Sequence, residues 1–351
     1  MTFIILTIIL LILALVTYFF LVVRIGQTPR GKRLELIKQS SNYRNGRFRN
    51  EVATQTITSN KRGLKRLVQL LRGRSKRAHP ETAIESVKTD LSSLDESVDY
   101  YVWFGHSSFL LNVNKVKLLV DPVLTNSFPM SLGGKPFKGA DIYTPEDMPE
   151  LDYLLLTHDH WDHLDYNTVK RIKHKVKKVI CPLGVGQHLE HWGYKPNSII
   201  ELDWKDSYKA RNNIQIHCLP SRHFSGRWLS RAKTLWASYL ISTDSKSIYI
   251  SGDGGYDNRF WNIKDQFGKI DVAIMENGQY NVDWAYVHLL PQDLLRATTD
   301  LAPDKLITVH HSKFVLGKHD WDEPLQNIEL IKRNYQEGEV LSTIIGQVVT
   351  L

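Results

Sequence analysis

The sequence of 351 residues has little cysteine, glycine or proline, and these shortages exclude several classes of protein. Two cysteines, Cys181 and Cys218, cannot make a disulfide scaffold or a cysteine-based zinc cluster, so we expect both to be reduced packing residues. With 21 glycines and 13 prolines, the chain is neither collagen-like nor low-complexity. A mean hydropathy of −0.28 excludes a polytopic membrane protein but allows one anchor.

Charged side chains are absent from the first 23 residues and concentrated in the segment that follows. Residues 24–79 carry 16 lysines or arginines against Glu35 and Glu51, a balance of +14, whereas the whole chain has a net charge of +8. The remainder of the chain is therefore mildly acidic. Positive charge confined to one segment gives little support to nucleic-acid binding by the rest, and we expect no nucleic-acid partner.

Residues 1–23 predict a transmembrane anchor, because about 20 apolar residues span the hydrocarbon core of a bilayer. A secretory signal would need a basic segment before a shorter apolar run and a small-residue cleavage site, and nothing basic precedes this run. Four basic residues follow it, namely Arg24, Arg30, Lys32 and Arg33. By the positive-inside rule we expect a single-pass protein of the cell membrane with its catalytic domain in the cytoplasm.

Residues 24–97 are interpreted as a basic juxtamembrane segment. Within it, residues 61–72 place apolar side chains at helical spacing and basic side chains over much of the remaining surface. This pattern suits a helix lying on a membrane that contains anionic lipid, and it suits equally a helix packed on the body.

Residues 98–351 predict an α/β or α+β domain, since short β-rich runs alternate with helical stretches. The predicted strands cover residues 100–104, 109–113, 117–120, 151–156, 214–219, 235–241, 247–250, 272–275 and 306–309. The predicted helices cover residues 168–175, 185–192 and 291–301.

The most informative segment is LDYLLLTHDHWDHLD, residues 151–165, in which three histidines and aspartates directly follow an apolar strand. Packing does not explain such a cluster at a strand end. His158, His160, Asp162 and His163 offer imidazole and carboxylate ligands that suit Zn²⁺, so the segment predicts a site for one or two metal ions.

Further candidate ligands follow later predicted strands. His223 comes after a strand and a Pro turn, Asp253 lies among glycines at a strand end, and either His310 or His311 follows another strand. His217 lies within its strand, and we expect its side chain on the sheet face.

This arrangement resembles the metallo-β-lactamase superfamily over roughly residues 98–351. The resemblance implies a metallo-β-lactamase-type αβ/βα sandwich with two zinc ions at one edge. Carried over by position, one ion would be held by His158, His160 and His223, the second by Asp162, His163 and His310, and Asp253 would bridge them. His310 is preferred to His311 because it comes first after the strand.

Two zinc ions would make a bridging hydroxide available near neutral pH and polarise the bond to be broken. Asp162 or Asp253 could orient the water or carry its proton. Thr157 and Asp165 are candidates for fixing imidazole tautomers. We assign no role to Asp159 or Trp161.

Several further segments are similar to the N-acylphosphatidylethanolamine-hydrolysing phospholipase D family and its bacterial relatives. They are YVWFGHSSF at residues 101–109, Asp121-Pro122, His163-Leu164-Asp165, IIELDW at residues 199–204, HFSGR at residues 223–227, GDGGY at residues 252–256 and SNYRNGRFRN at residues 41–50. The resemblance implies a phospholipid substrate. His288 matches a pocket-facing histidine of the family and is a substrate-contact or acid–base candidate, or else a loop histidine. His106 is either a support of the metal site or a turn histidine.

The leading hypothesis is thus a membrane-anchored, zinc-dependent phosphodiesterase of phospholipase D type, acting on N-acyl phosphatidylethanolamine or a related phospholipid. The family's animal members have His-Trp-Gly where this chain has His310-His311-Ser312, which leaves the lipid open. The alternatives are a lactonase or other acyl hydrolase on the same site, a nuclease, and a non-catalytic membrane module.

Overall fold

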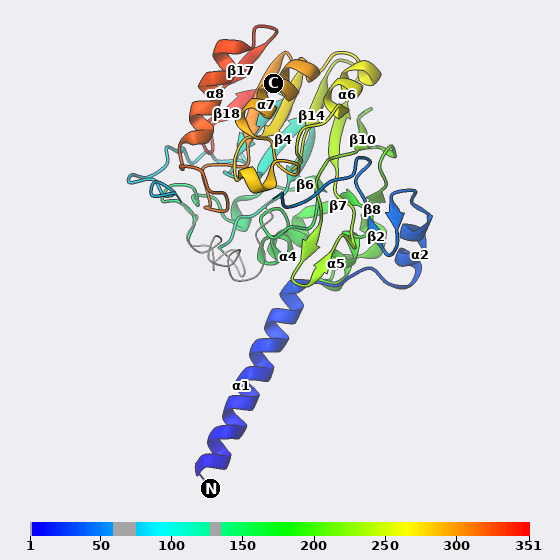
Figure 1. Ribbon diagram of the computed structural model, residues 1–351, viewed down its shortest axis with the longest axis vertical. Coiled ribbons are helices and arrows are strands. Elements are labelled where there is room, and N and C mark those ends of the chain that lie inside the picture. The colour runs from blue at the N-terminus through cyan, green and yellow to red at the C-terminus, as the bar shows by residue number, and fades with distance from the viewer. Residues whose placement is uncertain (1, 59–74, 127–134) are drawn as a thin grey trace.

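A computed structural model gives the arrangement of the chain, and it describes residues 2–58, 75–126 and 135–351 (Figure 1). The amphipathic helix predicted at residues 61–72 lies outside the described residues.

The described residues form two seven-stranded mixed sheets. In spatial order, the first sheet contains β18 (Val348–Thr350), β3 (Tyr100–Trp103), β4 (Phe109–Val113), β5 (Val116–Val120), β6 (Leu151–Leu155), β7 (Val176–Pro182) and β8 (Ile199–Leu202). The second contains β17 (Glu339–Leu341), β16 (Lys305–Val309), β15 (Val272–Glu276), β14 (Ser247–Ile250), β13 (Ser238–Ser242), β10 (Gln215–Leu219) and β9 (Ser207–Lys209).

The two sheets pack face to face because their strands are apolar on both faces. Successive side chains of a strand point to opposite faces. Leu118 and Val120 of β5 therefore join the core between the sheets, whereas Leu119 joins a second core on the outer face. Such doubly apolar strands need cover on both sides.

Helices provide that cover. The outer core of the first sheet includes residues of α4 (Tyr166–Ile172) and α5 (Gly186–His191). The outer core of the second includes residues of α6 (Arg259–Phe267), α7 (Pro291–Leu301) and α8 (Glu323–Asn334). Helix, sheet, sheet and helix thus follow one another, which confirms the predicted αβ/βα sandwich.

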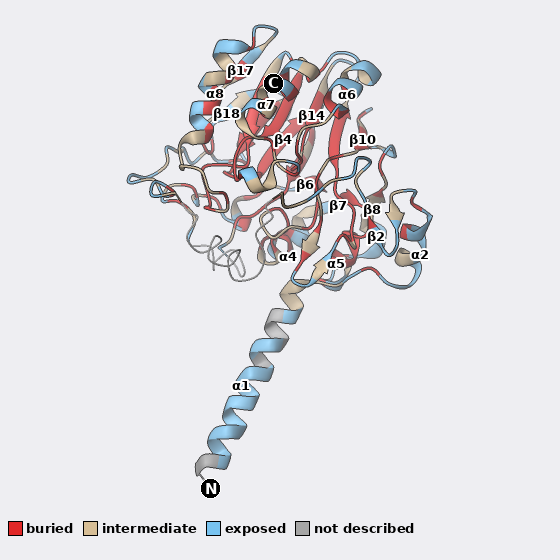
Figure 2. Ribbon diagram, in the orientation of Figure 1, coloured by how far each residue is buried: buried red, intermediate tan, exposed pale blue. Residues whose placement is uncertain are grey.

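The N-terminal part of the chain comprises α1 (Thr2–Ile25), α2 (Gly31–Gln39) and a hairpin of β1 (Tyr43–Arg44) and β2 (Arg47–Phe48). A second hairpin, β11 (Gly226–Arg227) with β12 (Ser230–Arg231), extends from the body. Figure 2 shows α1 projecting from the body as an exposed helix, while the strands are mostly buried. Part of the basic segment is packed on the body: Ile37 is fully buried, and Arg33 pairs with Glu190 and Glu201.

The prediction of a transmembrane anchor over residues 1–23 is not supported. Among the described residues, no helix combines the length and the apolar side chains that a membrane crossing requires.

The strand ends that carry the predicted metal ligands meet at one edge of the sandwich. Strands β14, β15 and β16 are parallel, so their carboxyl ends lie together. Strand β10 is antiparallel to β13, which is antiparallel to β14, and therefore runs in the same direction as β14. The loops after these strands and after β6 supply the site described next.

Candidate dimetal centre

The loop after β6 is folded so that it presents four potential ligands. His158 and His163 are buried, and His160 and Asp162 are partly exposed. The amides of His163 and Leu164 both donate to the carbonyl of His160, at 3.1 and 2.8 Å, which makes a tight turn. The turn brings four side chains that span only six residues onto one side of the loop.

One cluster combines two histidines of this loop with residues from the second sheet. His160 Nδ1 lies 2.9 Å from His158 Nε2 and 3.2 Å from His223 Nε2. Asp253 Oδ2 lies 3.9 Å from His158 Nε2 and 3.7 Å from His223 Nε2. The potential ligand atoms of these four residues all lie within 4.8 Å of one another, as a metal site requires.

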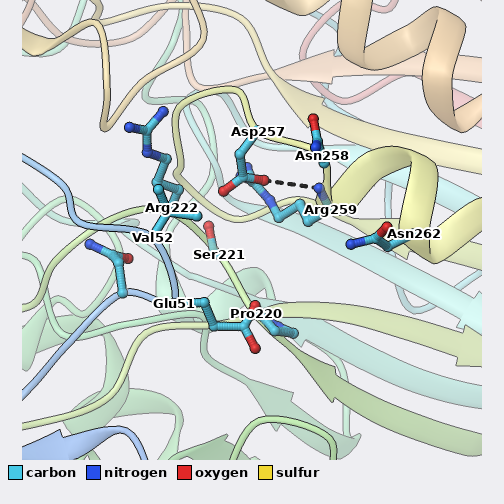
Figure 3. Close-up of a pocket in the computed structure, with 10 residues that line it drawn as sticks. Glu51, Val52, Pro220, Ser221, Arg222, Asp257, Asn258, Arg259 and Asn262 are labelled. Carbon is cyan, nitrogen blue, oxygen red and sulfur yellow. Dashed lines mark hydrogen bonds and ion pairs between the residues drawn. The ribbon is translucent and has the colours of Figure 1, made fainter.

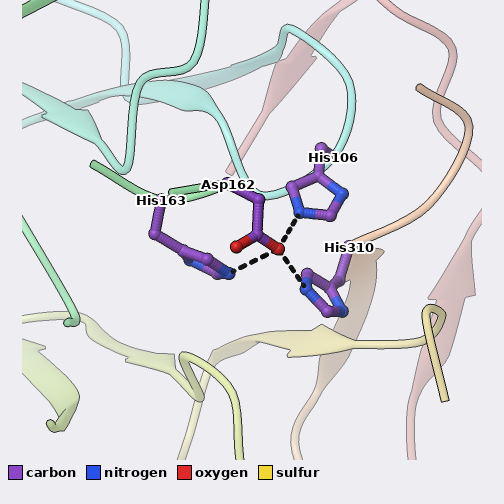
Figure 4. A group of neighbouring side chains, drawn as sticks. All are labelled: His106, Asp162, His163 and His310. Carbon is purple, nitrogen blue, oxygen red and sulfur yellow. Dashed lines mark hydrogen bonds and ion pairs between the residues drawn. The ribbon is translucent and has the colours of Figure 1, made fainter. Parts of the chain in front are cut away.

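A second cluster lies beside the first and is centred on Asp162 (Figure 4). Asp162 Oδ2 lies 3.0 Å from His106 Nε2, 3.7 Å from His163 Nε2 and 3.6 Å from His310 Nε2. Asp253 Oδ2 also reaches this cluster, at 3.2 Å from His163 and 3.3 Å from His310. Asp253 therefore stands between the two clusters, where a bridging ligand would stand.

The outer nitrogens of four rings are bonded, which turns each Nε2 toward the centre. His158 Nδ1 donates to Thr157 Oγ1 (2.9 Å), and His163 Nδ1 donates to Asp121 Oδ2 (2.8 Å). His223 Nδ1 donates to the carbonyl of Val287 (2.8 Å), and His310 Nδ1 donates to the carbonyl of Gly278 (3.0 Å). Thr157 accepts because its own proton goes to Asp121. A neutral imidazole that donates through Nδ1 has its lone pair on Nε2, which is the form that binds a metal.

The chemistry of these donors fits bound cations. Within the described part of the chain, the buried atoms His163 Nε2, His310 Nε2 and Asp253 Oδ1 have no hydrogen-bond partner. Burial, together with neighbouring histidines, lowers the pKa of His158 and His223 well below the usual range and keeps these imidazoles neutral. Although burial opposes their ionisation, neighbouring histidines hold the pKa of Asp162 and Asp253 well below that of a free carboxyl group. Burial opposes the charge on His163, but Asp253 and Asp162 outweigh it and raise the pKa of His163 well above its usual range, so a bound cation would displace that proton. Imidazoles and two carboxylates form a ligand set suited to divalent transition metals.

His310, and not His311, points into the centre. The backbone of His310 is left-handed, with φ of 72°, so that the two successive side chains diverge. The ring of His311 instead packs on Trp103, with ring centroids 4.8 Å apart, and its Nδ1 contacts Ser312.

Some supporting residues were only partly predicted. Thr157 contacts His158 as expected, whereas the Asp165 carboxylate accepts from Thr168 and Thr125 and caps α4. Asp121, which orients both Thr157 and His163, was not assigned a role. The strand-end position of Asp121 in an Asp-Pro pair was the available signal.

His288 belongs to a third group of potential ligands, with Asp253, His310 and the unpredicted Glu276. Its Nδ1 lies 2.7 Å from Glu276 Oε2. Glu276 Oε1 accepts from the amide of Gly254 at 2.6 Å, which fixes the carboxylate. Burial opposes the charge on His288, but Glu276 outweighs it and raises the pKa of His288. The ring can therefore hold a proton beside the centre.

Two cavities flank the loop that carries His223. One, of about 730 Å³, is lined by His223, Phe224, Arg231 and the N-terminal segment from Arg47 to Ile57. Asn50 closes one side of it by bonding both the amide and the carbonyl of His223. The other, of about 290 Å³, is lined mostly by polar residues, and the Asp257–Arg259 pair lies on its wall (Figure 3).

Comparisons with known proteins agree with this geometry. A family model described as a Beta-lactamase superfamily domain matches residues 117–311. An uncharacterized protein of Mycobacterium tuberculosis is 34% identical over 296 residues, which are 83% of this chain and 79% of the relative. The N-acyl-phosphatidylethanolamine-hydrolyzing phospholipase D 1 of Caenorhabditis elegans is 28% identical over 270 residues, covering 69% of this chain and 76% of that protein. The solved structure of Igni18, a metallo hydrolase of Ignicoccus hospitalis, has a TM-score of 0.56 at 21% identity and covers 72% of this chain and 98% of Igni18. This last likeness shows the fold alone.

Proposed function

The chain belongs to the β-lactamase superfamily and is a metal-dependent hydrolase, and on that premise we propose that it is a zinc-dependent phosphodiesterase that removes the headgroup of a phospholipid. The substrate proposed is N-acyl phosphatidylethanolamine or a close relative. The observation that carries the proposal is the paired cluster bridged by Asp253, joined to the similarity with the worm phospholipase D.

The ligand roles follow the two clusters. His158, His160 and His223 would hold one zinc ion, Asp162, His163 and His310 would hold the second, and Asp253 would lie between them. When bound, two such ions supply Lewis acidity, which neutralises charge on a phosphodiester and lowers the pKa of water.

The protein's own groups complete the reaction. Asp162 and Asp253 are placed to accept the proton of the attacking water. His288, held through Nδ1 by Glu276, would give the proton of Nε2 to the departing headgroup oxygen. Water adds to phosphorus, the bond between phosphorus and the headgroup oxygen breaks, and the products are phosphatidic acid and N-acylethanolamine.

The cavity beside His223 supports a phospholipid substrate. Its volume of about 730 Å³ admits part of an extended lipid, and Phe224 and Ile57 give it apolar wall. Arg47, Arg49 and Arg231 also line it, so positive charge is available to a phosphodiester that approaches the ions.

The test is a hydrolysis assay in H₂¹⁸O with N-acyl phosphatidylethanolamine in mixed vesicles and full-length, zinc-loaded protein. Mass spectrometry should find one ¹⁸O atom in phosphatidic acid. His163→Asn should abolish the reaction, and His217→Asn should not, because His217 lies on β10 and bonds Ser242 outside the clusters. Incorporation of ¹⁸O into a released fatty acid would instead assign acyl hydrolysis, and a bound metal with no lipid product would reject the lipid substrate.

A further inference from the structure

The end of α1 is bonded to the loop that carries the candidate metal ligands. The guanidinium of Arg227 donates from Nε to the carbonyl of Ile25 (2.9 Å) and from Nη2 to that of Arg24 (3.1 Å). From Nη1 the same group donates to the carbonyls of Asp159 (3.0 Å) and Leu164 (2.8 Å). One buried side chain thus joins the two segments. Figure 1 shows the end of α1 lying against the body.

The chemistry of both segments accounts for these contacts. The last carbonyls of a helix accept no hydrogen bond from the helix itself and need an outside donor. A cation at this end also interacts favourably with the helix dipole. Arg227 is 1% exposed, and its charge lies 3.7 Å from the ring centroid of Trp161, next to the ligand His160. Removing the guanidinium would leave carbonyls of the helix end and of the metal loop without their donor.

His188 makes a second connection. The amide of Gln27 donates to His188 Nδ1 at 3.0 Å, so the ring's proton is on Nε2, which lies 3.2 Å from Asp159 Oδ2. Asp159 stands between the candidate ligands His158 and His160. Its carboxylate also accepts from Thr234 and from the amide of Gly226, so it is held on all sides.

Gly26 is the residue that permits this contact. Its φ is +83°, and a Cβ atom added there would lie 2.3 Å from His188 Nδ1. Trp192 adds a third bond on the same side, from Nε1 to the carbonyl of Val23 at 2.8 Å. Backbone hydrogen bonds therefore hold the chain from Val23 to Gln27 against the body, independently of the side chains of α1.

We propose that residues 23–27, at the end of α1, are a positioning element of the metal centre, which they hold in ligating geometry through Arg227 and the His188–Asp159 pair. Displacement of α1 from the body then loosens the loop that carries His158 and His160 and weakens metal binding. The inference rests on the proposed metal centre, and it makes Asp159, Trp161 and Arg227 parts of the machinery that supports it.

The test compares two substitutions in the full-length protein, Gly26→Ala and Gly31→Ala. Both glycines have positive φ, +83° and +55°, so alanine strains the backbone at both. Only Gly26 faces His188, whereas a Cβ at Gly31 meets nothing within 4 Å. Zinc affinity is measured by competition with a chromophoric chelator, and the ligand field by the visible spectrum of bound Co²⁺. Gly26→Ala should lower affinity at least about tenfold and change the spectrum, as loss of a ligand's support does; Gly31→Ala should match the parent protein.

Hydrogen exchange on the same samples reports whether the end of α1 has left the body. A detached helix end with unchanged zinc affinity and Co²⁺ spectrum would overturn the proposal. If Gly26→Ala does not fold, Trp192→Phe, which removes the bond to Val23, takes its place with the same expectation. Failure of the parent protein itself to bind zinc would refute the proposed function, and is thereby distinguished from failure of the positioning element alone.

Discussion

Asp121 accepts a hydrogen bond from Nδ1 of His163 at 2.8 Å, although the two residues are 42 positions apart in the chain. The same carboxylate accepts from the amide and the hydroxyl of Thr157, whose oxygen in turn bonds His158. One buried carboxylate therefore orients a ring in each of the two clusters.

Replacing Asp121 should accordingly weaken both halves of the centre. We expect Asp121→Asn to lower metal affinity by about 10- to 100-fold, the usual effect of losing a group that orients a metal-binding histidine. Isothermal titration with Zn²⁺ measures this. Asp152→Asn is the matched control, because Asp152 is also a buried aspartate but pairs with Lys177 and Arg211 away from the centre. Equal losses in both variants would contradict the assignment.

Metal removal should destabilise the fold. A ligand that binds only the folded state stabilises it by about 4 kcal/mol when present at a thousand times its dissociation constant. We expect chelation to lower the unfolding temperature measured by calorimetry and Zn²⁺ to restore it. The Asp253→Asn variant lacks the carboxylate shared by the two clusters, so added Zn²⁺ should raise its unfolding temperature little. An unfolding temperature indifferent to chelator would argue against tight metal binding.

Glu276→Gln should slow turnover while the protein keeps its metal. A positioned general acid contributes about 100-fold or more to rate, and Glu276 keeps His288 charged. Without that carboxylate the pKa of His288 falls, so the alkaline limb of the kcat profile should move to lower pH. Metal analysis serves as the control. An unshifted profile would remove His288 from the reaction.

The burial of Lys313 should make the stability of the protein depend on pH in the alkaline range. This lysine is buried, donates to the carbonyls of Phe104 and Val123, and burial lowers its pKa to about 8. Between pH 8 and the unfolded value of 10.5 the unfolded chain holds the extra proton, so stability rises with pH across that window. Relative to Lys313→Met, the parent protein should gain up to about 3 kcal/mol in free energy of unfolding, measured with urea. Parallel curves for the two proteins would contradict this.

Much of the fold was predictable because its signals are local. Strands β4 and β14 and helix α7 have the predicted bounds, since each is an apolar run or a Pro-initiated periodic stretch. Strand β7 was missed because Lys177 and Lys178 in its first half are exposed and basic, which resembles a loop. Helices α6 and α8 were missed as well, although α8 has Pro324 in its first turn, which is a typical helix start.

The candidate ligands were predictable because each lies in the loop after a predicted strand, and the strands of each group end at one edge. Their supports were not, because these depend on contacts between distant segments. The residues near Glu276 in the sequence do not indicate that it faces His288. Those near Arg227 do not indicate that it binds the end of α1. Such pairs become visible only when the sheets are assembled.

The candidate centre draws ligands from both sheets, since His158, His160, Asp162 and His163 follow β6, whereas His223, Asp253 and His310 follow strands of the opposite sheet. A bound cation would thus act as a removable cross-link between the two layers. The time that the cation stays bound would then depend on how often the two sheets separate. The rate of metal release would therefore measure the opening motion between the sheets. Neither layer alone could assemble the site.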